Sequence, residues 1–555
     1  MSRRMLPSLG PGLLMLVLGL IGAGRPVLSW DEVATADVAR RTPGQIWLLI
    51  QHVDAVFGPY YFLEHFWTSV AGSGAVSLRL PSIVAMAGAA ALVGALGRRY
   101  FGPATGAVAG VLFCLLPNTS RYAAEARPYA FACFFSLLAL LLLHRALDRP
   151  GPGRWVAYAF AVVFVGLAHL IALTTLAAHP VVMWRYGSRR TVKIWTASAG
   201  LALLALVPLF WLGMRQRGTQ LAWVQPLSTD VLWQFPGNIA GSVAAGWLLL
   251  GLTVVGLCRP VRDRPALAAM LFGPLVAVGL LSVLVAPYWV PRYLLVVLAP
   301  LVLLAAAGLR DVLFPASGPA AVPIPAPRSP VAVSPDLVSS PPIPGPAPAF
   351  PPDPAPAFPP GPAPAFPPGP APAFPPDPTP APALGPASEA PAPVRRRLLA
   401  YAATTARVAL IFALVACAVY PAQRIVRGPH AKAGNDYRTA AAIVGHDQLP
   451  GDGIVYTAHN RTMRAGLTSY LHHVPQDVLV ARTAAAAGQL HAIEAPPTEA
   501  RLAGTSRLWL FLDGHHPNPL TVRKDLAAVL DGRFHLDRIW FPRNATLALY
   551  VRGRG

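Results

Sequence analysis

Long apolar stretches separated by short polar turns make up most of the chain before residue 313. A helix that crosses a bilayer needs about 20 mostly apolar residues. This pattern predicts eleven spanning helices, at about 10–29, 76–97, 103–118, 128–147, 155–170, 171–186, 195–213, 239–257, 266–287, 292–309 and 398–420. The expected fold is therefore mainly α, a polytopic membrane helix bundle.

Two later regions follow different patterns. In residues 313–394 the motif P-A-P-A-F-P-P-D/G occurs four times between Pro346 and Asp377, which predicts a polyproline II or disordered linker. Residues 421–555 alternate strand-like and helix-like segments, which indicates a small soluble α/β domain. The strands are expected at 453–458, 477–481, 507–512 and 545–551, and the helices at 435–444, 460–473 and 518–530. The domain plan is thus a core at 1–312 with a first outer loop at 30–75, the linker, a last spanning helix at 395–420 and the C-terminal domain.

Composition supports a membrane protein and argues against nucleic acid as a partner. Of the 555 residues, 54% are hydrophobic and 12% are charged, whereas soluble domains carry about 25% charged residues. The net charge of +21 comes from short clusters between apolar runs and not from one basic face. Cys114, Cys133, Cys258 and Cys417 lie in apolar runs without a C-x-x-C pair, which excludes a disulfide or zinc framework.

Basic clusters predict which turns face the cytoplasm. With a cytoplasmic N-terminus, and the first apolar run kept as a helix, every inside turn is basic: Arg98–Arg99, Arg145–Arg154, Arg185–Lys193, Arg259–Arg264 and Arg395–Arg397. The linker is then cytoplasmic. The first loop, the turns at 118–127, 169, 215–238 and 286–292, and the C-terminal domain are extracytoplasmic.

Candidate chemistry gathers at the expected outer helix ends. Asp31 and Glu32 follow the first apolar run and have no basic neighbour in sequence before Arg40, and burying such a charge unpaired is costly. Arg127 and Arg292 each adjoin a proline and have a tyrosine close by. A planar guanidinium suits a phosphate, and a nearby carboxylate suits proton abstraction from an acceptor. The candidate catalytic residues are Asp31 and Glu32, and the candidate phosphate- or substrate-binding residues are Arg127, Arg292, Glu125, Tyr129, Tyr293, His52, Asp54 and Tyr60.

Several motifs resemble those of the polytopic GT-C glycosyltransferases. They are W-D-E at Trp30–Glu32, S-L-R-L-P-S-I at Ser77–Ile83, E-A-R-P-Y-A at Glu125–Ala130 and P-R-Y-L at Pro291–Leu294. The resemblance is to family 39: protein mannosyltransferases, the bacterial aminoarabinose transferase and actinobacterial relatives. It implies a polyprenyl-monophosphate sugar donor, an inverting displacement on the outer membrane face and a first-loop carboxylate as base, with Asp31 ahead of Glu32. The chain departs from the eukaryotic enzymes of this family, whose H-P-P loop signature is replaced here by F-G-P-Y-Y.

Three functions remain open at this stage. The first is a sugar transferase acting in the bacterial cell membrane on a glycan, lipid or protein acceptor, with mannose or another hexose or pentose as the sugar. The second is a flippase for a lipid-linked glycan, although transporters usually contain internal repeats and polar residues at mid-membrane. The third is an anchored binding module. No metal or other cofactor is indicated, and the richness in Ala, Arg and Pro is typical of a GC-rich bacterial genome.

Overall fold

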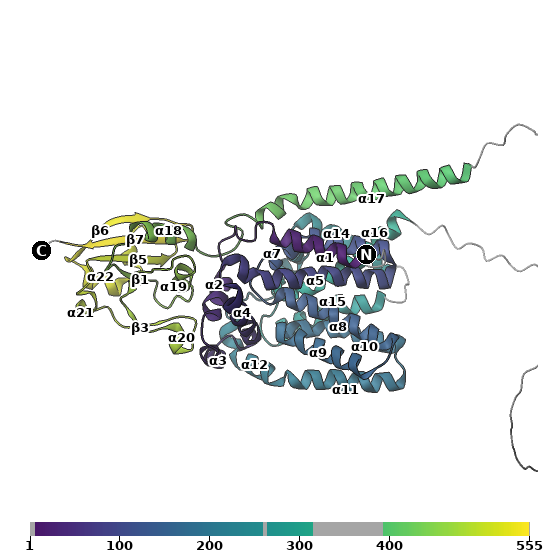
Figure 1. Cartoon of the computed structure of the whole chain (residues 1–555), viewed down its shortest axis with the longest axis horizontal. Helices are drawn as coiled ribbons and strands as arrows, with labels where there is room; N and C mark the ends of the chain where they lie inside the picture. The colour runs from purple at the N-terminus through teal and green to yellow at the C-terminus, as the bar shows by residue number, and fades with distance from the viewer. Residues whose placement is uncertain (1–5, 259–263, 315–391, 554–555) are drawn as a thin grey trace, which may run out of the picture. The chain divides into compact units, whose positions relative to one another are not determined.

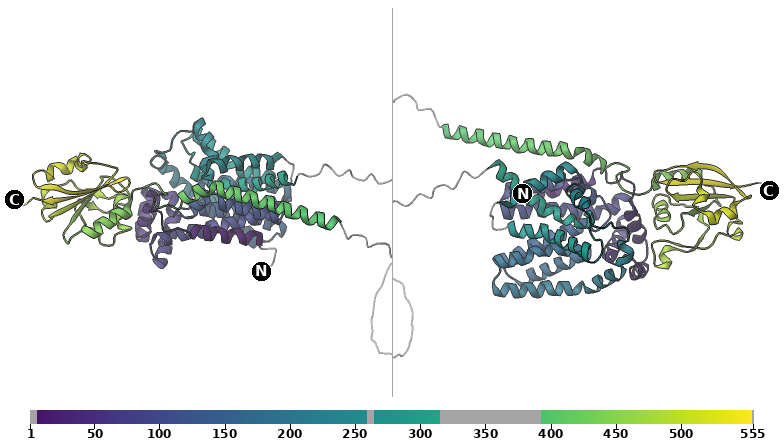
Figure 2. Two further views of the ribbon diagram at one scale, coloured as in Figure 1. Left: turned by 90° about the horizontal axis from the view of Figure 1, so that it is seen from above. Right: turned by 180° about the vertical axis from the view of Figure 1, so that it is seen from behind.

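The computed structural model of the protein describes residues 6–258, 264–314 and 392–553. The described residues before 315 and those from Thr404 onward belong to one compact unit. The repeats from Pro346 to Asp377 lie outside the described residues. Up to residue 314 the chain is a helix bundle, and most of its long helices run roughly parallel to one another (Figures 1 and 2).

The helices outside the first loop and the C-terminal domain mostly coincide with the predicted apolar stretches, although residues 117–123 and 229–240 are helical where the sequence predicts polar turns. They are α1 (Leu6–Leu20), α5 (Ala75–Phe101), α6 (Pro103–Leu115), α7 (Pro117–Ala123), α8 (Tyr129–Asp148), α9 (Pro152–Ala168), the 3₁₀ helix η2 (Leu170–Ala177), α10 (Ala178–Tyr186), α11 (Arg189–Ala205), α12 (Val207–Leu221), α13 (Thr229–Ala240), α14 (Val243–Cys258), α15 (Arg264–Leu284), the 3₁₀ helix η3 (Pro291–Val297), α16 (Leu298–Leu313) and α17 (Ala392–Ile425).

The number of long spans is smaller than the eleven that the sequence predicts. Among the described residues, four helices are long and apolar enough to cross a membrane, and up to six if each of two bent pairs counts as one span. The bent pairs are α11 with α12, at 47°, and α13 with α14, at 96°. Proline and glycine explain part of the difference, since Pro117 begins a new helix one residue after α6 and Gly241 ends α13 in a left-handed conformation.

The first outer loop is made of short helices. They are α2 (Trp30–Ala39), α3 (Pro43–His52), the 3₁₀ helix η1 (Ala55–Phe57) and α4 (Gly58–Ala71). Ser29 caps α2 and Thr42 caps α3, each in a reciprocal capping box. These caps fix where α2 begins, and therefore where the first-loop carboxylates point.

The C-terminal domain is a mixed sheet with helices on both faces. Its five-stranded sheet has the order β2-β1-β5-β7-β6, in which β1 is parallel to β2 and β5, and β7 is antiparallel to β5 and β6. Its elements are α18 (Tyr437–Asp447), β1 (Gly453–Tyr456), α19 (Met463–Thr468), β2 (Gln476–Asp477), β3 (Val480–Arg482), α20 (Ala484–Ala487), β4 (Ile493–Glu494), α21 (Glu499–Leu502), β5 (Arg507–Asp513), the 3₁₀ helix η4 (Pro519–Thr521), α22 (Lys524–Leu530), β6 (Phe534–Trp540) and β7 (Ala545–Arg552).

The two faces of this sheet bury different cores. Trp509 and Phe511 of β5 pack with residues of α18, α19 and α2, whereas Leu508 and Leu510 of the same strand pack with residues of α21 and α22. The predicted strands at 453–458, 507–512 and 545–551 are present, but the one at 477–481 divides between β2 and β3, which belong to different sheets. The edge strand β6 was not predicted. The first core also contains Val33 of α2, so it joins the domain to the first loop.

A close helix contact in the bundle depends on glycine. Helices α14 and α16 meet at Gly256 and Gly308, and a Cβ added at Gly308 would collide with the carbonyl oxygen of Leu252. Small residues let helix backbones approach closely in lipid, where van der Waals packing drives association.

We expect Gly308→Ala to destabilise the protein, because the added methyl group meets rigid backbone. Overpacking of this kind costs about 1–3 kcal/mol, and the thermal unfolding midpoint in detergent should fall accordingly. Gly251→Ala on α14 is the matched control, since its Cβ would meet nothing within 4 Å. Equal midpoints for the two variants would contradict the packing argument.

Candidate active site

Glu32 is a fully buried carboxylate at the start of α2, and four donors satisfy it. Its Oε2 accepts from the backbone N–H of Ser29 at 3.0 Å, closing the capping box. Arg79 of α5 donates from Nε to Oε1 and from Nη2 to Oε2, each at 2.8 Å, and Lys432 donates from Nζ to Oε1 at 2.6 Å. The backbone N–H of Ala126 adds a contact of 3.1 Å.

This arrangement makes Glu32 a permanent anion. Burial alone would raise the pKa of Glu32, but Arg79 and Lys432 outweigh burial and hold the pKa well below its usual value. The carboxylate lies outside the lining of the neighbouring cavity. Glu32, the lesser candidate base beside Asp31, thus has its carboxylate oxygens occupied by Arg79, Lys432 and two backbone N–H groups.

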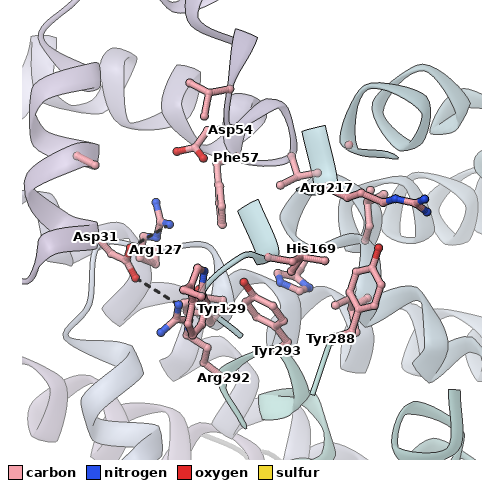
Figure 3. Close-up of a pocket in the computed structure, with 18 of the residues that line it drawn as sticks. Asp31, Asp54, Phe57, Arg127, Tyr129, His169, Arg217, Tyr288, Arg292 and Tyr293 are labelled. Atoms are coloured by element: carbon pink, nitrogen blue, oxygen red, sulfur yellow. Dashed lines mark ion pairs between the residues drawn. The ribbon is translucent and has the colours of Figure 1, made fainter. Parts of the chain in front are cut away.

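Asp31, the preceding residue, faces an open space instead. Its side chain is 23% exposed and lies 3.5 Å from Arg127 Nη2 and 3.9 Å from Arg292 Nη2, the second of these being the dashed contact in Figure 3. Burial would raise the pKa of Asp31, but Arg127 and Arg292 lower it more, so its pKa lies below the usual value. Asp31 has no basic neighbour in the sequence, yet it has two in the structure.

Aromatic rings hold both guanidiniums. The Cζ atom of Arg127 lies 4.0 Å from the ring centroid of Phe57, and that of Arg292 lies 4.7 Å from the centroid of Trp223. Cation–π contacts of this kind favour a charged group over a ring face. The two arginines are thus fixed on either side of Asp31 with nitrogen atoms directed at the same place.

These groups line a cavity of about 950 Å³, shown in close-up in Figure 3. Several of its buried polar atoms have no hydrogen-bond partner within the described part of the chain. They are Arg127 Nε, Arg292 Nε, Tyr129 OH, His169 Nδ1 and Glu125 Oε2. Buried polar atoms are normally paired, and a mostly apolar cavity with a few converging polar groups is the usual form of a ligand site.

An aromatic cluster forms one wall of this cavity. The His169 ring centroid lies 5.8 Å from that of Tyr129 and 5.0 Å from that of Tyr293. Burial, with the charges of Arg292 and Arg127, lowers the pKa of His169 to about 4. At neutral pH the imidazole is uncharged, so it can offer a ligand hydroxyl one donor and one acceptor.

Seven of the ten predicted site residues line the cavity: Asp31, Asp54, Glu125, Arg127, Tyr129, Arg292 and Tyr293. Besides Glu32, the exceptions are His52, which is exposed and has its Nδ1 2.9 Å from the carbonyl oxygen of Leu48, and Tyr60, which is buried with its hydroxyl 3.3 Å from Ser82 Oγ. Asp54 accepts a hydrogen bond of 2.7 Å from the Tyr61 hydroxyl.

Sequence reasoning missed other residues of the lining. They are Phe57, Arg121, His169, Arg217, Trp223, Tyr288, Lys432 and Arg461. Arg121, His169, Arg217 and Trp223 lie in turns that the sequence analysis placed on the outer side of the membrane. Their common side could have indicated that they belong to the same site as Asp31. Lys432 and Arg461 come from the C-terminal region, and no local pattern points to the cavity.

No group of three or more His, Cys, Asp or Glu side chains that could hold a metal ion occurs in the ranges that the structure describes. The charged atoms around Asp31 are instead guanidinium and ammonium groups. Guanidinium groups of this kind bind anions, and a carboxylate beside them can accept a proton.

Two comparisons connect this chain with known proteins. Residues 57–212 match the family described as dolichyl-phosphate-mannose-protein mannosyltransferase. The fold matches crystal structures of ArnT from Cupriavidus metallidurans: the apo form with a TM-score of 0.53, 13% identity and 96% of each chain covered, and a form bound to undecaprenyl phosphate with a TM-score of 0.53, 14% identity and coverage of 97% of this chain and 96% of that chain.

A human prostacyclin receptor is 29% identical over 134 residues, which is 21% of this chain and 35% of the receptor. That match covers a minor part of either protein and supports no functional argument. The family match and the ArnT-like fold agree with each other, and both agree with the resemblance of the W-D-E and E-A-R-P-Y-A motifs. Residues 57–212 of the chain are thus similar to the dolichyl-phosphate-mannose-protein mannosyltransferases, and the chain as a whole has a fold similar to that of the multi-pass membrane protein ArnT.

Proposed function

We propose that the protein transfers a sugar from a polyprenyl-monophosphate donor to a hydroxyl group of an extracytoplasmic acceptor. The observation that carries this proposal is the position of the Asp31 carboxylate between the guanidiniums of Arg127 and Arg292 on the cavity wall. A phosphate and a nucleophile have to meet in one place for this reaction. The two arginines provide a site for the first, and Asp31 provides a base for the second.

The donor phosphate is assigned to Arg127 and Arg292. Guanidiniums bind phosphate oxygens in a planar, often bidentate manner, and each of these two has an unpartnered buried Nε. Phe210, Leu281 and Val285 extend the lining along α12 and α15 and offer an apolar surface for an isoprenoid. The ArnT structure with bound undecaprenyl phosphate has this same fold, which supports the assignment.

The transfer is a single displacement with inversion. The acceptor hydroxyl oxygen attacks the anomeric carbon, and its proton passes to an Asp31 carboxylate oxygen. The bond between the anomeric carbon and the phosphate oxygen breaks, and its electron pair leaves with the polyprenyl phosphate. Arg127 and Arg292 stabilise the negative charge that grows on the departing phosphate.

Donor binding also activates the base. Arg127 and Arg292 lower the pKa of Asp31, so its carboxylate is a weak base beside the two free guanidiniums. A bound phosphate competes for both guanidiniums and neutralises part of their charge. The pKa of Asp31 then rises, and the carboxylate becomes a stronger proton acceptor when the substrate is in place.

The sugar ring is assigned to the wall formed by Tyr129, His169 and Tyr293. A neutral imidazole and a phenol offer hydrogen bonds to sugar hydroxyls, and the polar atoms concerned, His169 Nδ1 and Tyr129 OH, lack partners within the described residues. This wall suits an uncharged hexose or pentose, and the name of the matched family favours mannose.

The first test is Asp31→Asn, which keeps the shape of the side chain and removes its basicity. A general base contributes about 10²–10⁴-fold, so the single-turnover rate should fall by that factor while donor binding persists. Asp230→Asn on the exposed start of α13 is the matched control and should transfer at the wild-type rate. Normal turnover by Asp31→Asn would remove Asp31 from the mechanism.

Arg292→Ala should behave differently, because it removes a charge-assisted contact to the phosphate in both the ground state and the transition state. Donor binding and the transfer rate should both decline. Arg215→Ala serves as the control, since Arg215 is exposed, stacks on Trp211 and does not line the cavity. If the wild type consumes no polyprenyl-phosphate sugar at all, transport of a lipid-linked glycan becomes the better explanation.

We also place the first loop and the C-terminal domain outside the cell membrane and the N-terminus in the cytoplasm, because basic clusters mark alternate turns. The test uses two single cysteines in a background without the four native ones. Gly153→Cys and Gly504→Cys are a matched pair, since a Cβ at either position would meet nothing within 4 Å. A membrane-impermeant thiol reagent should label position 504 and not position 153 in intact cells; the reverse would invert the topology.

A further inference from the structure

The segment of residues 429–435, which follows α17, runs beside the entrance to α2. The backbone N–H of Val27 donates to the carbonyl oxygen of Pro429 at 3.1 Å, and that of Trp30 donates to the carbonyl oxygen of Ala433 at 3.4 Å. The indole Nε1 of Trp30 also donates to Asn435 Oδ1 at 2.9 Å. Segment 429–435 therefore positions residues 27–30, which lead directly into Asp31.

The C-terminal domain fixes segment 429–435 from the other side. Arg543 donates to the carbonyl oxygens of His430 and Lys432 at 3.1 and 2.9 Å. Asn435 donates from Nδ2 to Asp513 Oδ1, at the end of β5, at 2.8 Å. The position of this segment is thus set by the folded sheet domain and not by the helix bundle alone.

Lys432 is the residue of segment 429–435 that contacts the buried carboxylate of Glu32. Its side chain is 3% exposed, and its ammonium group donates to Glu32 Oε1 at 2.6 Å and to the carbonyl oxygen of Ala124. Burial lowers the pKa of Lys432 to about 8 against the opposing effect of Glu32, so the ammonium form prevails at neutral pH. Lys432 also borders the cavity that holds Asp31.

We propose that Lys432 is a positioning residue through which the C-terminal domain holds α2 so that Asp31 lies between Arg127 and Arg292. Glu32 is the next residue after Asp31, and a shift of the Glu32 carboxylate moves the whole first turn of α2. The proposal rests on the proposed role of Asp31 as the base. It assigns the C-terminal domain a part in the reaction itself.

The ion pair between Glu32 and Arg79 distinguishes a positioning role of Lys432 from a role in holding the fold together. Without Lys432, Glu32 keeps its two-point ion pair with Arg79, so no buried charge is left alone. The fold should therefore survive the loss of the ammonium group, and what changes is the tie between the C-terminal domain and α2. Misplacement of a catalytic group by about 1 Å costs about 10²-fold in rate.

The test compares Lys432→Met, Lys432→Arg and the wild-type full-length protein in single-turnover transfer, with binding of polyprenyl phosphate measured separately. Lys432→Met should lower the rate at saturating donor by about 10²-fold and leave the dissociation constant unchanged. Lys432→Arg should recover most of the rate, because it keeps a cation that can bond Glu32. Lys524→Met, at an exposed lysine of the same domain, should behave as wild type.

Two results would overturn the proposal. Weaker binding of polyprenyl phosphate by Lys432→Met with an unchanged rate would mean that Lys432 contacts the donor directly. A normal rate for Lys432→Met, when Asp31→Asn is inactive, would show that α2 needs no tie to the domain and would leave the proposed function intact. If Asp31→Asn is also active, the proposed function fails as well.

If Lys432→Met does not fold, Arg543→Met tests the same proposal. Arg543 lies in the C-terminal domain, and its guanidinium donates to three carbonyl oxygens of segment 429–435, those of His430, Lys432 and Gly434. The loss of Arg543 should also lower the transfer rate, by a smaller factor than Lys432→Met does, again with unchanged binding of polyprenyl phosphate. A wild-type rate for Arg543→Met would contradict positioning through this segment.

Discussion

The buried carboxylate of Glu32 is the constraint around which the active centre is arranged. An ion at this depth is tolerated only with close partners, and removing one partner of such a pair typically costs about 3–5 kcal/mol. Glu32 draws its partners from three separate places: Arg79 on α5, the N–H of Ala126 before α8, and Lys432 after α17. The contact with Ala126 also places the next residue, Arg127, at the cavity. Satisfying one structural charge thus sets the positions of the groups that surround Asp31.

Asp31 and Glu32 have different surroundings because they are consecutive residues of one helix. Successive residues of an α-helix differ by about 100° around the axis, so Asp31 and Glu32 at the start of α2 cannot face the same surroundings. Glu32 turns into the protein, where it is fully paired, and Asp31 turns into the cavity with part of its surface open. The capping box at Ser29 fixes the rotation of the first turn. Glu32 therefore orients the first turn of α2, and with it Asp31, the proposed base.

Apolar runs predicted most of the long helices, although α7 and α13 lie where polar turns were expected. Carboxylates and guanidiniums at expected helix ends singled out Asp31, Arg127 and Arg292, and the structure places all three on one cavity. The sequence could not reveal the 96° bend between α13 and α14, because tertiary packing determines how two apolar helices meet. The residues alone could not separate Asp31 from Glu32, since both are acids in one motif; only the family resemblance ranked Asp31 first. Lys432 stands 400 positions from Glu32 in sequence within G-P-H-A-K-A-G-N, which has no periodic signal. The edge strand β6 was not predicted because apolar and polar residues do not alternate along the whole of F-H-L-D-R-I-W. Most of this strand is exposed.

The distance along the chain between Glu32 and Lys432 also matters during biosynthesis. Ribosomes add about 5–20 residues per second, so about 20–80 s pass between the synthesis of the two partners. During this interval the helices before residue 314 can already be inserted, and Arg79 is the one of the two cations bonded to Glu32 that is present. Lys432 is made only with the chain that leads into the sheet domain. A ribosome that stalls in the proline-rich stretch has therefore made neither α17 nor Lys432, so the proposed catalytic centre is completed only after the last spanning helix has been synthesised.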